Sequence, residues 1–222
     1  MDRKQYWHDI FEKAARKSTT SARSSFFSDT NVKVLHNEVR RLVGQPVGKT
    51  IIDVGCGDGS LLRHLTQTNR VVGLDYSQSM LEHATACGLE PMRADFDNIP
   101  LAAASFDIVV SVESITLSED PYDCIARFMD LLAPDGILIL SVLNNFSVIR
   151  KVVTPFFQVF TRELPKSLRP DKVLDIIKRH GGRIENLSTT VIFPRKSIVF
   201  PVQIGSKAIY FGNNIVIKAV KE

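Results

Sequence analysis

The chain has 222 residues, of which 44% are hydrophobic and 23% charged, and its formal net charge is +4. These values are ordinary for a globular domain that buries a substantial core, and the charged first residues contain no apolar segment of a secretory signal. No run approaches the roughly 18 apolar residues that a membrane-spanning helix needs. The three cysteines are far apart and include no CxxC pair, so we expect a cytoplasmic protein with neither a bound metal nor a disulfide framework.

Charge is distributed unevenly along the chain. Residues 1–50 carry a net charge of +5, residues 51–143 carry −10 and residues 144–222 carry +9. This pattern predicts an acidic core between cationic outer layers, which could meet an anionic substrate, a membrane surface or nucleic acid. Solvated lysines and arginines on helix surfaces are the more ordinary interpretation for most of these cations.

The first 47 residues predict a helical cap or lid in front of the core domain. Apolar residues recur at helical spacing over residues 3–17 and 31–43, and the Ser/Thr-rich stretch between them indicates a loop or an ordered lid. The Gly/Pro-containing stretch GQPVGK then leads into residues 48–222, which we expect to form the core.

Within the core region, short apolar runs alternate with helix-compatible stretches. The runs consist mostly of unalternating β-branched residues and leucines, as expected for strands with both faces buried. This alternation predicts an α/β fold with a doubly wound, mostly parallel sheet. The predicted strands cover residues 50–54, 71–75, 91–95, 106–112 and 136–142, and the predicted helices between them cover residues 60–68, 78–87 and 122–132.

The regular pattern breaks at residues 144–170, which mix large apolar residues with cations. Three interpretations stay open for this insertion: a core helix packed on the sheet edge, a lid over an apolar substrate, and a peripheral membrane contact. A helix over residues 171–180 follows, and residues 183–192 and 213–221 predict two closing strands.

The segment Ile51–Ser60, IIDVGCGDGS, places a glycine-rich turn between a predicted strand and a predicted helix. Such glycines permit a tight turn and let the backbone approach a ligand closely, and the start of the helix offers unpaired N–H groups. No GK[ST] follows, which excludes an ATP-type phosphate loop. The turn alone therefore predicts a nucleotide-like cofactor, as in NAD- and FAD-binding proteins.

Carboxylates at strand ends narrow the identity of the cofactor. Asp75 ends the second predicted strand, 20 residues after Gly55, where it can accept hydrogen bonds from both ribose hydroxyls. Asp95 ends the third predicted strand just before Phe96, a pair that suits an adenine, and Asp53 could orient a methionine ammonium group. An acidic pocket without donors for a pyrophosphate favours S-adenosylmethionine, which carries a sulfonium and no phosphate.

The motifs IIDVGCGDGSLLRHL, VVGLDYSQSML and RADFDNIPLAAASFDIVVSVES resemble those of the seven-stranded class I S-adenosylmethionine-dependent methyltransferases. The resemblance implies the strand order 3-2-1-4-5-7-6 with the last strand antiparallel, and S-adenosylmethionine as the cofactor. Met80 suits the core equally well, and Cys56 is expected mainly to pack inside the turn. The cofactor contacts implied along the motifs are Asp53, Gly55, Cys56, Gly57, Asp75, Tyr76, Met80, Asp95, Phe96, Ser111 and Val112.

Methyl transfer depends on in-line positioning of the acceptor, and a general base assists when the acceptor is a hydroxyl. The segment FDIVVSVESITLSEDP is distantly similar to ubiquinone-pathway O-methyltransferases, in which an acidic residue is followed three places later by Glu-His. Glu113 matches the acid, whereas Thr116 and Leu117 replace the pair, which counts against quinone O-methylation. Glu113 is thus a candidate base or a carboxylate that fixes the loop. His8 is a second candidate catalytic residue or an ordinary helix residue, and Asn144 could line the acceptor site.

Three other functions fit parts of the sequence. An NAD(P)-dependent oxidoreductase would share the sheet, but no Tyr-x-x-x-Lys pair occurs. A nucleic-acid methyltransferase would use the basic ends, but the (N/D/S)PP(Y/F) motif and a Pro-Cys nucleophile are absent. A catalytically inert S-adenosylmethionine-binding module stays open because the Glu-His pair is missing. The sequence favours an enzyme that methylates a small molecule, apolar or lipid-like, without a nucleic-acid partner.

Overall fold

The computed structural model of the protein describes residues 5–7, 9–10, 12–13, 29–148, 151, 165–192, 197–204, 206–210 and 212–222. The described residues of the predicted N-terminal helix are helical. His8 and the middle of the 144–170 insertion lie outside the described residues, so the interpretations of both stay predictions.

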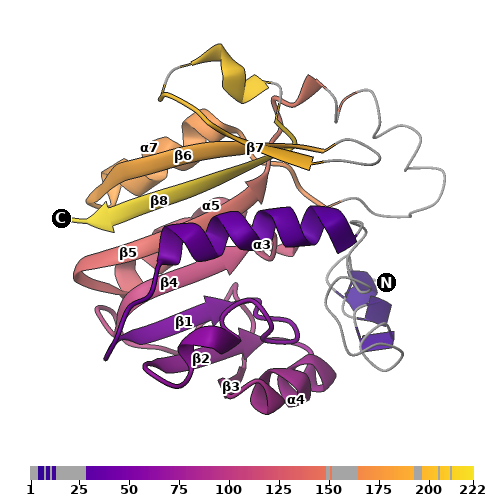
Figure 1. The fold of residues 1–222 in the computed structure, drawn as a ribbon, viewed down its shortest axis with the longest axis vertical. Coiled ribbons are helices and arrows are strands. Elements are labelled where there is room, and N and C mark those ends of the chain that lie inside the picture. The colour runs from indigo at the N-terminus through magenta and orange to yellow at the C-terminus, as the bar shows by residue number, and fades with distance from the viewer. Residues whose placement is uncertain are drawn as a thin grey trace.

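One mixed, mostly parallel sheet forms the centre of an α/β fold (Figure 1). Its strands are β1 (Thr50–Val54), β2 (Arg70–Asp75), β3 (Glu90–Arg93), β4 (Phe106–Val112), β5 (Leu132–Leu143), β6 (Gly182–Ile192), β7 (Ser197–Pro201) and β8 (Asn214–Lys221). The order in the 8-stranded sheet is β3-β2-β1-β4-β5-β8-β6-β7. The first five strands in this order are parallel, β8 is antiparallel to β5 and β6, and β7 is antiparallel to β6.

The sheet contains the expected order 3-2-1-4-5-7-6, with β8 as the seventh strand, but the expected count of seven strands was wrong. β7 adds another strand at the edge, paired with β6. Its residues SIVFP include β-branched and aromatic side chains that favour strands, and an edge strand tolerates the closing Pro201. The sequence pattern missed β7 because one short apolar run cannot be told from an apolar loop by periodicity.

Helices cover both faces of the sheet; they are α3 (Asp29–Val43), α4 (Gln78–Ala86), α5 (Pro121–Leu131) and α7 (Pro170–Arg179). Two buried clusters form the core, one under α3 and α4 and the other under α5 and α7. Neighbouring strand residues belong to different clusters: Ile51 and Val71 to the first, Ile52 and Val72 to the second. Burial on both faces explains why these strands have continuous apolar sequences.

The α-helix expected over residues 60–68 is not formed, and the segment consists of turns around the short 3-10 helix η1 (Arg63–Leu65). Arg40 on α3 takes carbonyl groups that an α-helix would use. Its Nε donates to the carbonyl oxygen of Leu61 at 3.0 Å and its Nη2 to that of Ser60 at 2.8 Å. These two bonds hold the start of the segment in its turn conformation. The glycine turn is therefore not followed by the N-terminus of an α-helix.

The other predicted elements of the core are confirmed to within a few residues at their ends. α4, α5 and α7 coincide with expected helices, and β6 and β8 with the two closing strands. One difference bears on the site. The third strand was expected to reach residue 95 but ends at Arg93, so Asp95 lies in the loop that follows β3.

Candidate functional site

The glycine turn lies where β1, β2 and β4 end, at the edge of the sheet where ligands bind in doubly wound folds. The N–H groups of Gly55 and Cys56 both donate to the carbonyl oxygen of Leu74 in β2, at 2.7 and 3.0 Å. Gly55 has a φ of 77°, and a Cβ atom on it would lie 2.2 Å from Cβ of Ser114. Only glycine therefore fits this position.

Two serines brace the turn from the end of β4. Ser114 donates from Oγ to the carbonyl oxygen of Val54 at 2.9 Å, and its Oγ lies 2.7 Å from Oγ of Ser111. Ser111 is fully buried, and Val112 packs against the cluster under α3 and α4. Ser111 therefore supports the turn through Ser114, and contact of Ser111 or Val112 with a cofactor stays a prediction.

Asp75 at the end of β2 links the turn to α4. Its Oδ2 accepts the N–H of Gly57 and its Oδ1 accepts the N–H of Ser77, each at 2.9 Å. Ser77 caps α4 by accepting the N–H of Met80 on its Oγ at 3.2 Å. Burial raises the pKa of Asp75, against the lowering effect of the bonds from Ser77 and Gly57. A carboxylate has further lone pairs, so Asp75 shapes the site and can also accept hydrogen bonds from a ligand.

Asp53 lies in β1, two residues before Gly55. It is 1% exposed, and its Oδ2 has no hydrogen-bond partner among the described residues. Burial, together with the carboxylates of Asp75 and Asp58, raises the pKa of Asp53 to about 7. A buried acceptor without a donor costs free energy, and a ligand ammonium group would satisfy it. Asp53 therefore fits the methionine ammonium group of S-adenosylmethionine.

Asp95 and Phe96 follow β3 in a short loop at the same edge. Oδ1 of Asp95 accepts the N–H of Asp97 at 2.9 Å, and Phe96 packs, partly buried, against the cluster under α5 and α7. Tyr76, which follows β2, is 40% exposed. The guanidinium of Arg93 lies 5.9 Å from the centre of the Tyr76 ring, and its Nε donates to the Tyr76 carbonyl oxygen at 3.3 Å. A carboxylate and two aromatic rings thus follow the ends of β2 and β3.

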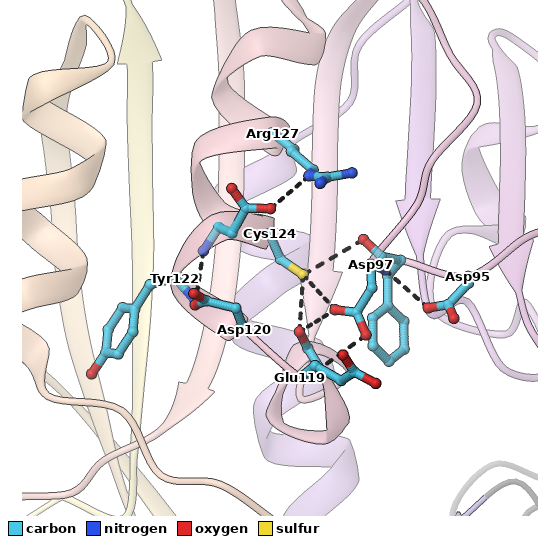
Figure 2. A network of polar contacts seen from close by, with 10 residues as sticks. Asp95, Asp97, Glu119, Asp120, Tyr122, Cys124 and Arg127 are labelled. Carbon is cyan, nitrogen blue, oxygen red and sulfur yellow. Dashed lines mark hydrogen bonds and ion pairs between the residues drawn. The ribbon is translucent and has the colours of Figure 1, made fainter. Parts of the chain in front are cut away.

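A polar network that the sequence did not indicate holds this loop in place (Figure 2). Asp97 accepts hydrogen bonds from Oγ of Ser118, from the N–H of Glu119 and from the thiol of Cys124. Ser118 and Glu119 lie just before α5, and Cys124 lies on it. The available signal was the spacing of two acids in ADFDN, which places Asp97 two residues after Asp95.

Cys56 in the turn and Met80 on α4 have buried, uncharged side chains. Cys56 is buried, and a Cβ atom on Gly73 in β2 would lie 3.0 Å from its Sγ. Burial raises the pKa of Cys56 well above its usual value, so its thiol stays protonated. Met80 is 4% exposed on α4. Both residues pack in the core, and a cofactor contact from either stays a prediction.

Glu113 stands at the end of β4 in a strained backbone conformation. Its φ is 58°, a region that non-glycine residues rarely adopt and that clusters at functional sites. Ser141 in β5 donates from Oγ to Oε1 of Glu113 at 2.6 Å, and the N–H of Glu113 donates to the Ser141 carbonyl oxygen at 3.0 Å. The carboxylate therefore has a defined orientation, one residue before the Ser114 that touches the glycine turn.

Asn144, named above as an acceptor-site candidate, uses its amide within the protein. Its Nδ2 donates to the carbonyl oxygens of Ile209 and Gly212 at 2.6 and 2.8 Å, and its Oδ1 accepts the N–H of Phe146 at 2.9 Å. The side chain is fully buried. Asn144 therefore anchors the segment that precedes β8 to the end of β5.

The N-terminal helix lies against α4, which begins beside Asp75. Glu12 accepts a hydrogen bond from Oγ of Ser79 at 2.8 Å. Trp7 is 2% exposed, with its ring edge-on to that of Tyr6. The described part of this helix therefore runs close to the proposed cofactor site, and the catalytic role of His8, which lies outside the described residues, stays a prediction.

Comparison with known proteins agrees with this geometry. Residues 52–140 match the protein family described as "Methyltransferase domain". The ubiquinone biosynthesis O-methyltransferase of Haemophilus ducreyi is 27% identical over 180 residues, which cover 72% of this chain and 75% of that protein. The matched segment identifies a methyltransferase domain in this chain, and the fold is that of the class I S-adenosylmethionine-dependent methyltransferases. The predicted cofactor, S-adenosylmethionine, is the cofactor of this family.

Other relatives of this methyltransferase define the extent of the similarity. Magnesium protoporphyrin IX methyltransferase from Synechocystis PCC 6803, in a crystal structure with bound SAH, has the same fold, with a TM-score of 0.70 at 19% identity and 100% coverage of both chains. A Bos taurus protein named "Probable tRNA methyltransferase 9B" is 30% identical over 142 residues, 63% of this chain but 29% of that protein. The chain thus spans less than a third of the bovine relative's length, and the names of the relatives divide between two kinds of acceptor.

Proposed function

We propose that this methyltransferase moves a methyl group to a small-molecule acceptor, apolar or lipid-like. The observation that carries the cofactor site is Oδ2 of Asp53, buried beside the glycine turn and without a donor among the described residues. S-adenosylmethionine supplies a methyl group on a sulfonium sulfur, which the acceptor nucleophile takes by in-line displacement. The role of the protein is to hold both partners in line, which accounts for much of the rate in such reactions.

Three hydrogen-bond-donating parts of the cofactor each have a matching carboxylate in this proposal. Asp53 receives the methionine ammonium group, Asp75 the ribose hydroxyls and Asp95 the exocyclic amine of adenine. Gly55 lets the turn pack closely against Ser114, where a Cβ atom would clash, and so keeps the turn in place beside the proposed ligand. The summed negative charge favours a cationic ligand and disfavours the pyrophosphate of NAD.

The pairing of surface cations supports a small-molecule acceptor over tRNA. Nucleic-acid binding draws much of its affinity from cations that replace counterions on phosphates. Cations already paired with a neighbouring carboxylate contribute less to such binding. Arginines of the basic C-terminal third are paired in this way: Arg169 with Asp171, Arg179 with Asp175, and Arg183 with Glu185 and Glu222.

Transfer of a labelled methyl group tests the acceptor class. The protein is incubated with methyl-labelled S-adenosylmethionine and either a cell extract of metabolites and lipids or total tRNA. We expect label in the extract, concentrated in its organic-soluble part, and none in tRNA. Label in tRNA alone would overturn the small-molecule assignment. Binding of S-adenosylhomocysteine in calorimetry, without label in either fraction, would favour an inert cofactor-binding module; binding of NAD in its place would favour an oxidoreductase.

The 144–170 insertion begins and ends at the site, which supports a lid over the acceptor. Leu168 donates its N–H to the carbonyl oxygen of Leu143 at 2.8 Å and accepts the N–H of Asn145 at 2.9 Å. The N–H of Lys166 donates to the carbonyl oxygen of Thr116, three residues after Glu113, at 2.8 Å. A segment whose ends meet beside the proposed catalytic carboxylate is well placed to cover it.

Vesicle binding separates a lid from a peripheral membrane contact. Within the described ranges, no helix has both the length and the apolar character for a membrane crossing. We propose that any membrane contact is peripheral and uses the apolar and cationic residues of 144–170. Binding to anionic vesicles that is lost in Phe156→Asp with Phe157→Asp would support this contact. Absence of binding at low salt would leave the lid and the core helix packed on the sheet edge.

A further inference from the structure

Asp97 joins two parts of the site that are distant in the sequence. Its backbone N–H donates to Oδ1 of Asp95 at 2.9 Å. Its own Oδ1 accepts hydrogen bonds from Ser118 and Cys124, and its Oδ2 accepts the N–H of Glu119 at 3.2 Å (Figure 2). One residue therefore contacts the proposed adenine carboxylate through its backbone and the start of α5 through its side chain.

The two side-chain donors to Asp97 are buried, and both keep their protons. Ser118 is fully buried and Cys124 is 1% exposed. Burial raises the pKa of Cys124 to about 12, so its thiol stays a donor at ordinary pH. The single proton of this thiol has two alternative acceptors, the carbonyl oxygen of Phe96 at 3.5 Å and Oγ of Ser118 at 3.2 Å. Hydrogen bonds to a carboxylate are stronger than those between neutral groups, so these donors restrain Asp97 firmly.

The residues that hold Asp97 are themselves held from the other side. Lys166 donates from Nζ to the carbonyl oxygens of Ser118 at 2.9 Å and Glu119 at 2.5 Å. Its backbone N–H also donates to the carbonyl oxygen of Thr116 at 2.8 Å. The turn at residues 116–119 is therefore held by both Lys166 and Asp97. Asp97 in turn connects the loop after β3, which contains Asp95, to this turn.

We propose that Asp97 is a positioning residue that sets the adenine specificity of the cofactor site by holding the carboxylate of Asp95 in its accepting orientation. The inference rests on the adenine contact of Asp95 in the proposed function. Asp97 acts through Asp95 and has no ligand contact of its own in this scheme. Loosening it should weaken the hydrogen bond from the adenine amine and leave the contacts assigned to Asp53 and Asp75 in place.

Two ligands separate an adenine effect from a general loss of binding. S-adenosylhomocysteine carries the amine, and S-inosylhomocysteine carries a carbonyl oxygen in its place, which a carboxylate does not bind. Calorimetry gives the ratio of the two dissociation constants. We expect the wild-type protein to favour the adenine ligand and Asp97→Ala to lower this preference about tenfold, the size of one hydrogen bond to a charged group. The affinity for the inosine ligand should stay unchanged.

Conservative variants and a matched control complete the experiment. Cys124→Ser keeps a donor and should retain more of the preference than Cys124→Ala. Asp107→Asn alters a carboxylate at the other end of β4, where it accepts the N–H of Thr50 at 2.8 Å and bonds Nζ of Lys49 at 3.2 Å, and should leave the preference unchanged. Ser118→Ala removes one donor and replaces Asp97→Ala if that variant does not fold.

The outcomes distinguish this inference from the proposed function. An unchanged preference in a folded Asp97 variant, or equal losses for both ligands, would overturn the positioning role. Failure of the wild-type protein to bind S-adenosylhomocysteine would overturn the proposed cofactor site itself. Wild-type binding without any preference for adenine would remove Asp95 from the amine contact and Asp97 with it.

Discussion

The backbone N–H of Gly57 donates to Oδ2 of Asp75 at 2.9 Å, so the carboxylate that ends β2 is built into the turn that follows β1. A second backbone N–H, from Ser77, fixes the other oxygen of the same carboxylate. A group already held in this way loses little freedom when a ligand binds, which favours affinity. The turn and Asp75 therefore act as one unit.

Replacing Asp75 with asparagine should weaken this unit strongly. The amide has one accepting oxygen, so the N–H of either Gly57 or Ser77 loses its hydrogen-bond acceptor. The ribose hydroxyls of the ligand also lose a charged acceptor. We expect the affinity for S-adenosylhomocysteine, measured by calorimetry, to fall about 10- to 100-fold. Glu90→Gln is a control, since it changes an exposed carboxylate on β3 that pairs with Arg70. An unchanged affinity in Asp75→Asn would remove Asp75 from the ligand contacts.

Alanine substitutions at two glycines distinguish the cost of a steric clash from the cost of backbone strain. Gly55 and Gly44 have similar φ values, 77° and 74°, but a Cβ atom on Gly44 would meet nothing within 4 Å, whereas one on Gly55 would overlap Ser114. We expect Gly44→Ala to lower the free energy of unfolding by about 1 kcal/mol. Gly55→Ala should lower it several times more and abolish binding of S-adenosylhomocysteine.

Urea denaturation of a double-variant cycle checks the cause. In the Ser114→Gly background the clashing Cβ is absent, so Gly55→Ala should cost less there than in the wild-type protein. The same cost in both backgrounds would contradict the steric explanation.

The sequence predicted the strands that position the site better than the segment after the glycine turn. β1, β2 and β4 are apolar on both faces, and such continuous apolar runs can be recognised as strands from the sequence alone. The helix expected over residues 60–68 depended on local pattern alone. Its carbonyl groups are taken by Arg40, about 20 residues earlier in the chain, and a contact at that separation leaves no local signal.

The same distinction holds for the candidate site. Asp53, Asp75 and Asp95 were proposed from the sequence because parallel strands bring their carboxyl ends to one edge, although Asp95 lies two residues beyond the end of its strand. Asp97 was missed because its partners Ser118 and Cys124 are 21 and 27 residues away. The strained φ of Glu113 likewise results from tertiary contacts, so the residue type alone could not show it.

The raised pKa of Asp53, about 7, predicts that the protein without ligand loses stability as pH rises. An unfolded aspartate releases its proton near its ordinary pKa of about 4. Between that value and about 7 the folded state holds a proton that the unfolded state has released, so the free energy of unfolding falls with rising pH. Asp53→Asn should remove this contribution. The free energy of unfolding is measured by urea denaturation at several pH values in this range. If it falls with pH as steeply in Asp53→Asn as in the wild-type protein, another group is responsible.

Ligand binding should have the opposite pH dependence. An ammonium group pairs with the ionised form of Asp53, so below its pKa of about 7 binding must release the proton. We therefore expect the affinity for S-adenosylhomocysteine to rise with pH up to that value. Calorimetry in buffers of different ionisation enthalpy should detect release of up to about one proton per ligand in the wild-type protein. Equal release in Asp53→Asn would exclude Asp53 as its source.

Glu113→Gln tests the proposed general base with little change in shape. The amide oxygen can still accept the hydrogen bond from Oγ of Ser141, so the orientation of the side chain is kept. If Glu113 removes a proton from the acceptor, transfer of label to the cell extract should fall about 10²- to 10⁴-fold. The affinity for S-adenosylhomocysteine should stay unchanged, because the proposed cofactor site consists of Asp53, Asp75 and Asp95 and does not include Glu113.

Glu113→Gly tests independently whether the strained backbone at this position serves activity or stability. Glycine adopts a φ of 58° without strain. The free energy of unfolding of this variant should therefore be closer to the wild-type value than that of Ser141→Ala. It should nevertheless lack transfer activity. Stability retained while activity is lost is the pattern expected when strain is maintained for function. Full activity in Glu113→Gln would instead leave Glu113 as a support of the loop after β4, with His8 as the next candidate for replacement.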